Sequence, residues 1–240
     1  MNEGLTITID GRSCACERGE YLYDVAARNG IFIPTLCRSD DFPEHRACCR
    51  VCIVEVETKG RRKVVTSCVY PVEQECAVYT NSERIKRERA VILQLLHQRA
   101  PEAAPIAQMG SALGAGELPE LPVALDGEKC VMCGLCVQAC DTLGASAIST
   151  LSKGTDKHVG APFDVAPKPC IGCLNCAKSC PMDAIPYSED EYARSIWGRN
   201  FTLVYCEGCG KVLGTAAMFA HARHERGKAL PRLCEDCQKD

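Results

Sequence analysis

Two stretches of sequence decide the fold: residues 129–140 read KCVMCGLCVQAC, and residues 170–181 read CIGCLNCAKSCP. In each, three cysteines are separated by two residues and a fourth follows after three more, which is the ligand run of a [4Fe–4S] cluster. An Ala-Ile pair follows each run, Ala147-Ile148 and Ala184-Ile185. This internal repeat predicts two cluster loops, each leading through a short helix to a strand.

The repeat predicts a domain with two clusters over residues 126–190. In two-cluster ferredoxins the fourth cysteine of each run binds the other cluster. The first cluster is therefore expected to use Cys130, Cys133, Cys136 and Cys180. The second is expected to use Cys170, Cys173, Cys176 and Cys140. Gly134 and Gly172 would let the backbone approach the clusters closely. Zinc or disulfides held by the same eight cysteines are the alternative.

The composition limits the class of protein. The 240 residues include 20 cysteines, far above ordinary usage, as in disulfide frameworks or in metal proteins of reducing compartments. The N-terminus shows no secretory signal and no apolar run is long enough for a membrane helix, so we expect a cytoplasmic protein without direct membrane insertion. A net charge of −3 and 5% aromatic residues argue against a nucleic-acid surface.

Residues 1–80 predict a small α+β domain built around four cysteines. Alternating apolar residues and turn signals predict strands over 5–9, 13–16, 53–57 and 63–67, and a helix over 20–29. Thiolates from a loop and from strand ends suit a [2Fe–2S] cluster, because each iron needs two soft sulfur ligands. Four buried or free thiols in an unrelated β domain are the alternative.

Three segments carry a resemblance to a known family: PTLC at 34–37, CRVCIVEVE at 49–57 and VYTNSERI at 78–85. They are similar to the N-terminal [2Fe–2S] domain of the large iron–sulfur subunit of complex I, of the diaphorase iron–sulfur subunit of NAD-linked hydrogenases, and of iron-only hydrogenases. The resemblance implies a β-grasp fold whose ligands are Cys37, Cys49, Cys52 and Cys68. Cys48 is expected to be a non-ligand, because only Cys49 gives a Cys-x2-Cys chelate with Cys52. Three further cysteines are expected to be small buried residues: Cys14, Cys16 and Cys76.

Residues 81–125 depart from that family. A helix capped by Asn81 or Ser82 is expected over 81–100. In the family it leads to a cluster site of one histidine and three cysteines, but here His97 has no cysteine near it between residues 77 and 129. We therefore expect His97 to be a surface or interface residue. Residues 101–125, rich in proline, glycine and alanine, predict a linker or an extended wrap along a partner.

The tail, residues 191–240, contains two Cys-x2-Cys pairs 24 residues apart. This spacing predicts a zinc-ribbon-like module, in which four thiolates hold one tetrahedral zinc ion. The expected ligands are Cys206, Cys209, Cys234 and Cys237. His221 and His224 are alternative ligands, and a further iron–sulfur cluster is the rival occupant.

The sequence shows no catalytic residue set, P-loop or dinucleotide fingerprint. The expected protein is therefore a non-catalytic electron-transfer subunit of a hetero-oligomeric oxidoreductase. The resemblance implies that it relays electrons between an NAD(P)H-oxidising flavoprotein and a catalytic subunit such as a hydrogenase or formate dehydrogenase. A redox-sensing or scaffold protein and a free ferredoxin-like carrier are the alternatives.

Overall fold

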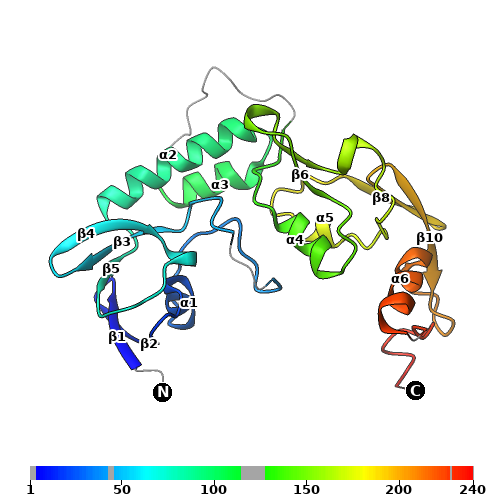
Figure 1. Ribbon diagram of the computed structural model, residues 1–240, viewed down its shortest axis with the longest axis horizontal. Helices are drawn as coiled ribbons and strands as arrows, with labels where there is room; N and C mark the ends of the chain where they lie inside the picture. Colours follow the sequence, from blue (N-terminus) through cyan, green and yellow to red (C-terminus); the bar gives the residue numbers. More distant parts are fainter. Residues whose placement is uncertain (1–3, 43–45, 115–127, 228, 240) are drawn as a thin grey trace. The chain divides into compact units, whose positions relative to one another are not determined.

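The computed structural model describes residues 4–42, 46–114, 128–227 and 229–239. The chain divides into two units, Met1–Cys133 and Gly134–Asp240, and Figure 1 labels most of their helices and strands. Within the described ranges, no helix has the length and apolar character needed to cross a membrane.

The first unit is built on a mixed five-stranded sheet in the order β2-β1-β5-β3-β4, in which β1 and β5 are parallel and the other neighbours antiparallel. This arrangement fits a [2Fe–2S] ferredoxin-like fold, as the resemblance implies. The predicted strands and first helix are confirmed, whereas β5 was not predicted from the sequence. The elements of this unit are β1 (Gly4–Ile9), β2 (Arg12–Glu17), α1 (Leu22–Arg28), β3 (Ile53–Thr58), β4 (Arg61–Thr66), the short 3-10 helix η1 (Ser67–Val69), β5 (Ala77–Tyr79), α2 (Glu83–Arg99) and α3 (Ala104–Ala112).

The core of the first unit lies between the sheet and α1. Alternate residues of β1 and β3 point inward, as the period of two along a strand requires, and they meet one face of α1. Cys14 and Cys16 are buried in this core as expected, and Cys76 is half-buried beside it. The largest fully buried side chains of the cluster are Ile7, Ile9, Leu22, Val25, Val54, Val56, Val72 and Val78.

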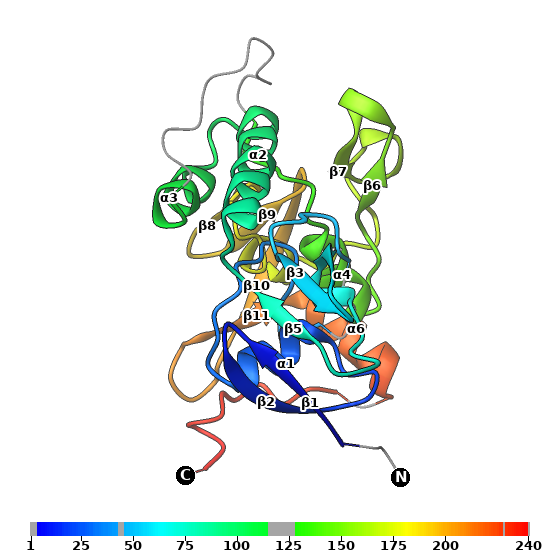
Figure 2. The same cartoon turned by 90° about the vertical axis from the view of Figure 1, so that its left-hand side faces the viewer.

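Helix α2 begins after Ser82, whose hydroxyl accepts a hydrogen bond from the amide of Ile85. Helix α3 lies beside α2 (Figure 2), with Ile106 fully buried. The expectation of a linker or extended wrap over 101–125 is therefore wrong for 104–112, which are helical. Residues 115–127 of that segment lie outside the described residues.

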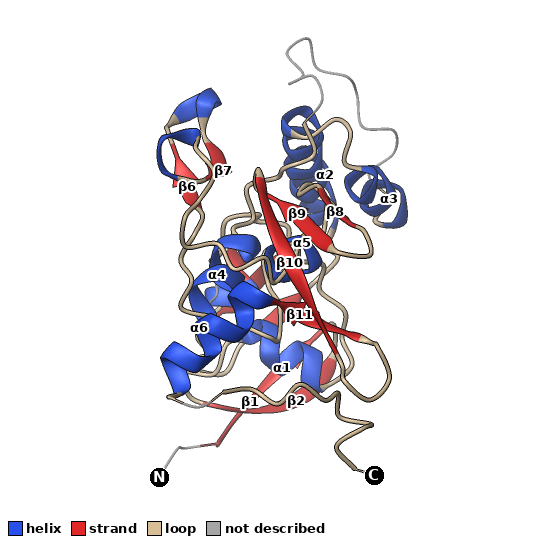
Figure 3. Cartoon of the chain, turned by 90° about the vertical axis from the view of Figure 1, so that its right-hand side faces the viewer, coloured by secondary structure: helices blue, strands red, loops and turns tan. Residues whose placement is uncertain are grey.

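The described part of the second unit contains two sheets, three α-helices and two short 3-10 helices, η2 and η3. Its larger sheet is antiparallel in the order β11-β10-β9-β8, and α6 packs against β10 and β11 (Figure 3). As the repeat predicts, each cysteine loop leads through a short helix, α4 or α5, to a strand, β6 or β8. The elements are α4 (Leu135–Thr142), β6 (Ser149–Leu151), η2 (Gly154–Asp156), β7 (His158–Gly160), η3 (Pro162–Asp164), α5 (Asn175–Lys178), β8 (Tyr187–Glu189), β9 (Ala193–Ile196), β10 (Arg199–Tyr205), β11 (Val212–Thr215) and α6 (Ala216–Arg226).

The tail is not a separate module. The expected boundary between residues 190 and 191 runs through one continuous sheet, because β8 before it pairs with β9 after it. Ile196 and Phe201 of that sheet also belong to the core that surrounds the second cysteine loop. The spacing of cysteines located the tail's thiols, but it contained no information about this sheet.

A buried arginine on α2 holds the cysteine loop of the first unit. The Arg89 guanidinium donates to the carbonyl oxygens of Val51 (3.0 Å), Ile53 (2.8 Å) and Thr80 (3.2 Å). Only 2% of Arg89 is exposed, and its burial lowers the pKa of the guanidinium from its ordinary value. Because Val51 lies between Cys49 and Cys52, Arg89 fixes the backbone that positions two predicted ligands.

Replacing this arginine is expected to loosen the loop. Arg89→Met keeps a long side chain but leaves three backbone carbonyls without their donor, which costs about 2–4 kcal/mol of folding free energy. Urea unfolding of the full chain, followed by circular dichroism, measures the loss. Arg87→Met on the exposed side of α2 is the matched control, and a change of about 0.5 kcal/mol or less is expected. Equal effects of the two substitutions would contradict the anchoring role.

Candidate metal centres

The four cysteines predicted to bind a [2Fe–2S] cluster are all buried and form two pairs. The Cys37 and Cys49 thiols are hydrogen-bonded, as are those of Cys52 and Cys68. The hydrogen bond from Cys68 lowers the pKa of Cys52 to about 6, while the bond to Cys37 and burial raise the pKa of Cys49. Two thiols for each of two irons is the donor set that the cluster needs, so these residues fit it.

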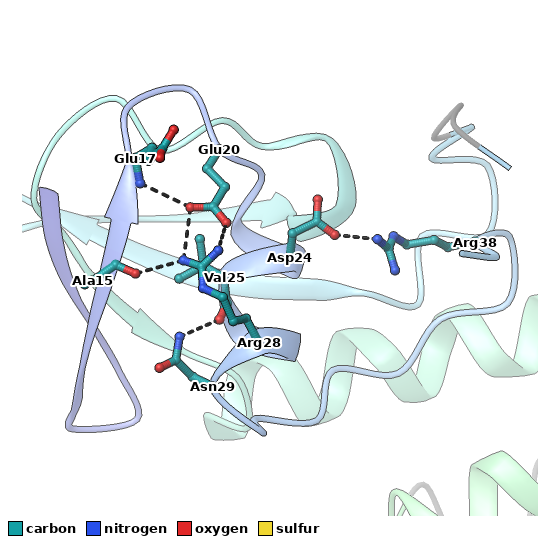
Figure 4. A network of polar contacts seen from close by, with 8 residues as sticks. All are labelled: Ala15, Glu17, Glu20, Asp24, Val25, Arg28, Asn29 and Arg38. Atoms are coloured by element: carbon teal, nitrogen blue, oxygen red, sulfur yellow. Dashed lines mark hydrogen bonds and ion pairs between the residues drawn. The ribbon is translucent and has the colours of Figure 1, made fainter. Parts of the chain in front are cut away.

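Ion pairs beside α1 fix the start of this cysteine loop. Arg38, which follows Cys37, forms an ion pair with Asp24 of α1 (Figure 4), and its guanidinium lies 4.5 Å from the centre of the Tyr23 ring. On the same helix, Arg28 pairs with Glu20, and that contact lowers the pKa of the Glu20 carboxyl. The helix and the loop are thereby tied at the residue next to the first thiol.

Cys48 lies closer to this group than the spacing suggested. Its thiol shares a hydrogen bond with Cys37, which lowers the pKa of Cys48, and it also donates to the carbonyl oxygen of Cys133 at 3.1 Å. Cys48 is exposed, whereas Cys49 is buried. Burial thus favours Cys49 as the ligand, and the choice between the two neighbours stays a prediction.

The second predicted [4Fe–4S] set comes together around one cavity. Cys140 from the first run faces the three cysteines of the second run, as the exchange of fourth ligands requires. Burial raises the pKa of Cys176 to about 11; the hydrogen bond from Trp197 opposes this rise, and the neighbouring thiols add to it. The cavity is apolar apart from its sulfurs, which suits a thiolate-bound cluster. It is lined by Cys140, Ala145, Ala147, Ile148, Cys170, Ile171, Cys173, Leu174, Cys176, Ile196 and Trp197.

The first predicted [4Fe–4S] set is divided between the two units of the chain. Cys130 and Cys133 fall in the first unit, and Cys136 and Cys180 in the second. The assignment of these four cysteines to one cluster therefore stays a prediction from the repeat.

Both cysteine loops use the same unusual backbone conformation. Met132 and Gly134 have φ of 56° and 78°, and the matching positions Gly172 and Leu174 have 69° and 64°. Non-glycine residues adopt this left-handed region at a cost, and such residues cluster at functional sites. Turns of this kind point successive amides into a shared concavity that favours negative charge, which a thiolate-bound cluster carries.

The Ala-Ile pairs that marked the repeat have a defined role in the structure. The amide of Ala147 donates to the Cys140 sulfur at 3.1 Å, and the amide of Ala184 donates to the Cys180 sulfur at 3.3 Å. The fourth cysteine of each run therefore receives a backbone hydrogen bond from the alanine of the pair that follows it.

The hairpin of β9 and β10 contacts the second cysteine loop, and this contact was not predicted from the sequence. Arg194 donates to the Gly172 carbonyl at 2.8 Å, and Arg199 donates to the Cys170 carbonyl at 2.8 Å. Phe201 lies so close that a Cβ on Gly172 would be 2.6 Å from its ring. Gly172 is thus needed both for its backbone angle and for the approach of Phe201.

The four tail cysteines form a compact group whose sulfurs all lie within 4.8 Å of one another. The sulfurs of Cys209 and Cys234 are 3.6 Å apart, and the Cys234 amide donates to Cys206 at 3.3 Å, which lowers the pKa of Cys206 to about 6. Thiolates bound at about 2.3 Å to one tetrahedral zinc ion are roughly 3.8 Å apart. The donor set therefore fits a single metal ion.

The two tail histidines do not join this group. The His221 ring donates from Nε2 to the Leu143 carbonyl at 2.7 Å, and His224 contacts the carboxylate of Glu225 at 3.3 Å. The alternative that either histidine replaces a cysteine ligand is therefore not supported. His97, in the last turn of α2, is half-buried.

Comparison with known proteins supports the resemblance drawn from the sequence. Residues 2–83 match the family described as "2Fe-2S iron-sulfur cluster binding domain". A solved structure described as NAD+-reducing [NiFe]-hydrogenase in the H2-reduced state matches with a TM-score of 0.57 and 26% identity, covering 65% of this chain and 74% of that chain.

The curated relatives are longer proteins. The NADP-reducing hydrogenase subunit HndD of Solidesulfovibrio fructosivorans is 31% identical over 80% of this chain, which spans 37% of that subunit. An NADH-quinone oxidoreductase subunit of Rhizobium meliloti is 30% identical over 86% of this chain, which spans 27% of that protein. Residues 2–83 thus match the 2Fe-2S iron-sulfur cluster binding domain family, and most of the chain is similar to part of the subunits of an NADP-reducing hydrogenase and an NADH-quinone oxidoreductase.

Proposed function

We propose that the chain relays electrons between an NAD(P)H-oxidising flavoprotein and a catalytic subunit such as a hydrogenase or formate dehydrogenase. The observation that carries this proposal is the gathering of Cys140 with Cys170, Cys173 and Cys176 around one cavity, in a chain that also has a [2Fe–2S] domain. When bound, iron–sulfur clusters accept and release single electrons. With four cysteine ligands each, they leave no open position for a substrate, so the chain itself is non-catalytic.

The proposed cofactors are one [2Fe–2S] cluster, two [4Fe–4S] clusters and one zinc ion. The compactness of Cys206, Cys209, Cys234 and Cys237 supports zinc over a further cluster. A cluster binds its thiolates on separate irons and so spreads them further apart, whereas one ion draws all four together. The proposed zinc ion would join the segment before α6, which contains Cys206 and Cys209, to the segment after it, which contains Cys234 and Cys237.

The relay predicts fast reduction within a complex. The chain, co-purified anaerobically with its native partners, is expected to have its clusters reduced by NADH or NADPH at least as fast as the complex turns over. Stopped-flow absorbance of cluster bleaching measures the rate. Reduction far slower than turnover would contradict the relay and favour a sensor or scaffold, and elution of the chain alone on gel filtration would favour a free carrier.

The cofactor set predicts the metal content of the anaerobically purified chain. About ten irons and one zinc per chain are expected, from one [2Fe–2S] cluster, two [4Fe–4S] clusters and one four-cysteine site. Inductively coupled plasma analysis with sulfide determination measures the content, and electron paramagnetic resonance (EPR) of the reduced protein separates the cluster types. About fourteen irons without zinc would overturn the tail assignment.

Adjacent cysteines provide a matched pair of variants for the [2Fe–2S] site. Cys49→Ser is expected to remove most of the [2Fe–2S] EPR signal, because a buried serine is a poor ligand for iron in place of a thiolate. Cys48→Ser is expected to keep the signal, because the exposed thiol lies outside the chelate. The two [4Fe–4S] signals are the internal control in both variants. The reverse pattern would make Cys48 the ligand.

A further inference from the structure

The turn between β9 and β10 contains Trp197, a residue type that such turns do not favour. Trp197 and Gly198 both have positive φ, 54° and 70°, in a two-residue connection between antiparallel strands. Such turns favour asparagine, aspartate or glycine at the first position, and a tryptophan there pays about 1–2 kcal/mol for its backbone conformation. The position of this side chain is therefore better explained by what the indole contacts.

The indole reaches a predicted cluster ligand. Trp197 Nε1 donates to the sulfur of Cys176 at 3.5 Å, and an indole nitrogen can only donate a hydrogen bond. The ring lines the cavity that holds the four thiols of the second set. Trp197 also lines an open surface hollow, together with Ile185, Pro186, Tyr187, Ser188, Ser195, Ile196 and Gly198. Trp197 and Ile196 are thus the residues common to the cavity and the hollow.

The hairpin is held firmly enough to keep the indole in place. Arg194 in β9 is buried and donates to Gly172, while Nη1 of Arg199 in β10 lies within hydrogen-bond distance of the carbonyls of residues 167, 168 and 170. These bonds lie on either side of the turn and connect it to the loop that contains Cys170 and Cys173. The hairpin therefore holds the Trp197 indole in a fixed position beside Cys176, as a hydrogen bond to a cluster ligand requires.

We propose that Trp197 sets the reduction potential of the second [4Fe–4S] cluster through its hydrogen bond to Cys176 and separates that cluster from the open hollow. The inference rests on the proposed function. One-electron reduction adds negative charge, part of which lies on the ligand sulfurs, so an N–H donor stabilises the reduced form more than the oxidised form. Trp197 is thus a positioning residue that raises the potential.

Substitution of the indole tests the proposal in the full chain. Trp197→Phe keeps an aromatic wall but removes the donor. At a fixed ambient potential, the reduced-to-oxidised ratio of the second cluster is expected to fall about three- to tenfold, a downward shift of about 30–60 mV at 59 mV per tenfold for one electron. EPR-monitored redox titration measures it, with the [2Fe–2S] and first [4Fe–4S] signals as internal references.

Tyr187→Phe is the matched control, because Tyr187 lines the same hollow but not the cluster cavity. It is expected to leave all potentials unchanged. If Trp197→Phe keeps full iron content and shifts no potential, the inference is overturned while the proposed function stands. A wild-type chain without two [4Fe–4S] signals would instead refute the proposed function.

A second measurement keeps the test decisive if Trp197→Phe fails to assemble its cluster. Trp197 is the only tryptophan of the chain, so growth on tryptophan labelled with ¹⁵N in the indole marks this one ring nitrogen without changing the protein. Pulsed EPR of the reduced protein is expected to resolve a ¹⁵N coupling on one [4Fe–4S] signal. The absence of any ¹⁵N coupling would overturn the hydrogen bond to the cluster ligand.

Discussion

Hydrogen bonds from arginine side chains to backbone carbonyl oxygens hold the cysteine loops of both units. In a loop whose backbone amides point toward the cysteine sulfurs, the backbone carbonyls point away from them. Carbonyls that are buried in this way need hydrogen-bond donors. Arg89 supplies three such bonds to the [2Fe–2S] domain. Arg194 donates to Gly172 of the second cluster loop, and Nη1 of Arg199 lies within hydrogen-bond distance of the carbonyls of residues 167, 168 and 170. A guanidinium suits this task, because it offers five donors in a fixed planar arrangement and stays charged when buried.

The same arginines have an electrostatic consequence. A cluster bound by four thiolates is an anion, and bringing it into an apolar cavity is unfavourable unless positive charge or oriented dipoles lie nearby. Burial is the dominant effect on Cys170 and Cys173 and raises the pKa of both thiols, while Arg199 and Arg194 respectively lie close enough to oppose that rise. Loop geometry and charge compensation therefore depend on the same side chains.

The sequence predicted the parts of the protein that depend on local spacing. The strands of the first domain, the Ala-Ile pairs and the two Cys-x2-Cys pairs of the tail all followed from residues near one another in the chain. The assignment of Cys37, Cys49, Cys52 and Cys68 as ligands came from the family resemblance and stays a prediction. The sequence did not predict α3, because Ala104–Ala112 has no side-chain cap and forms through contact with α2. Nor did it predict the approach of Phe201 to Gly172, since nothing in either segment encodes a contact across 29 residues.

The contact of Phe201 with Gly172 has a consequence for biogenesis. The second cluster loop is contacted by Arg194, Arg199 and Phe201, and its fourth thiol, Cys140, lies 61 residues before Phe201 in the chain. During synthesis, the thiols at 140–176 leave the ribosome before the hairpin that encloses them exists. Until residues 194–201 have been made, this loop lacks the contacts from Arg194, Arg199 and Phe201 that hold it in the folded chain.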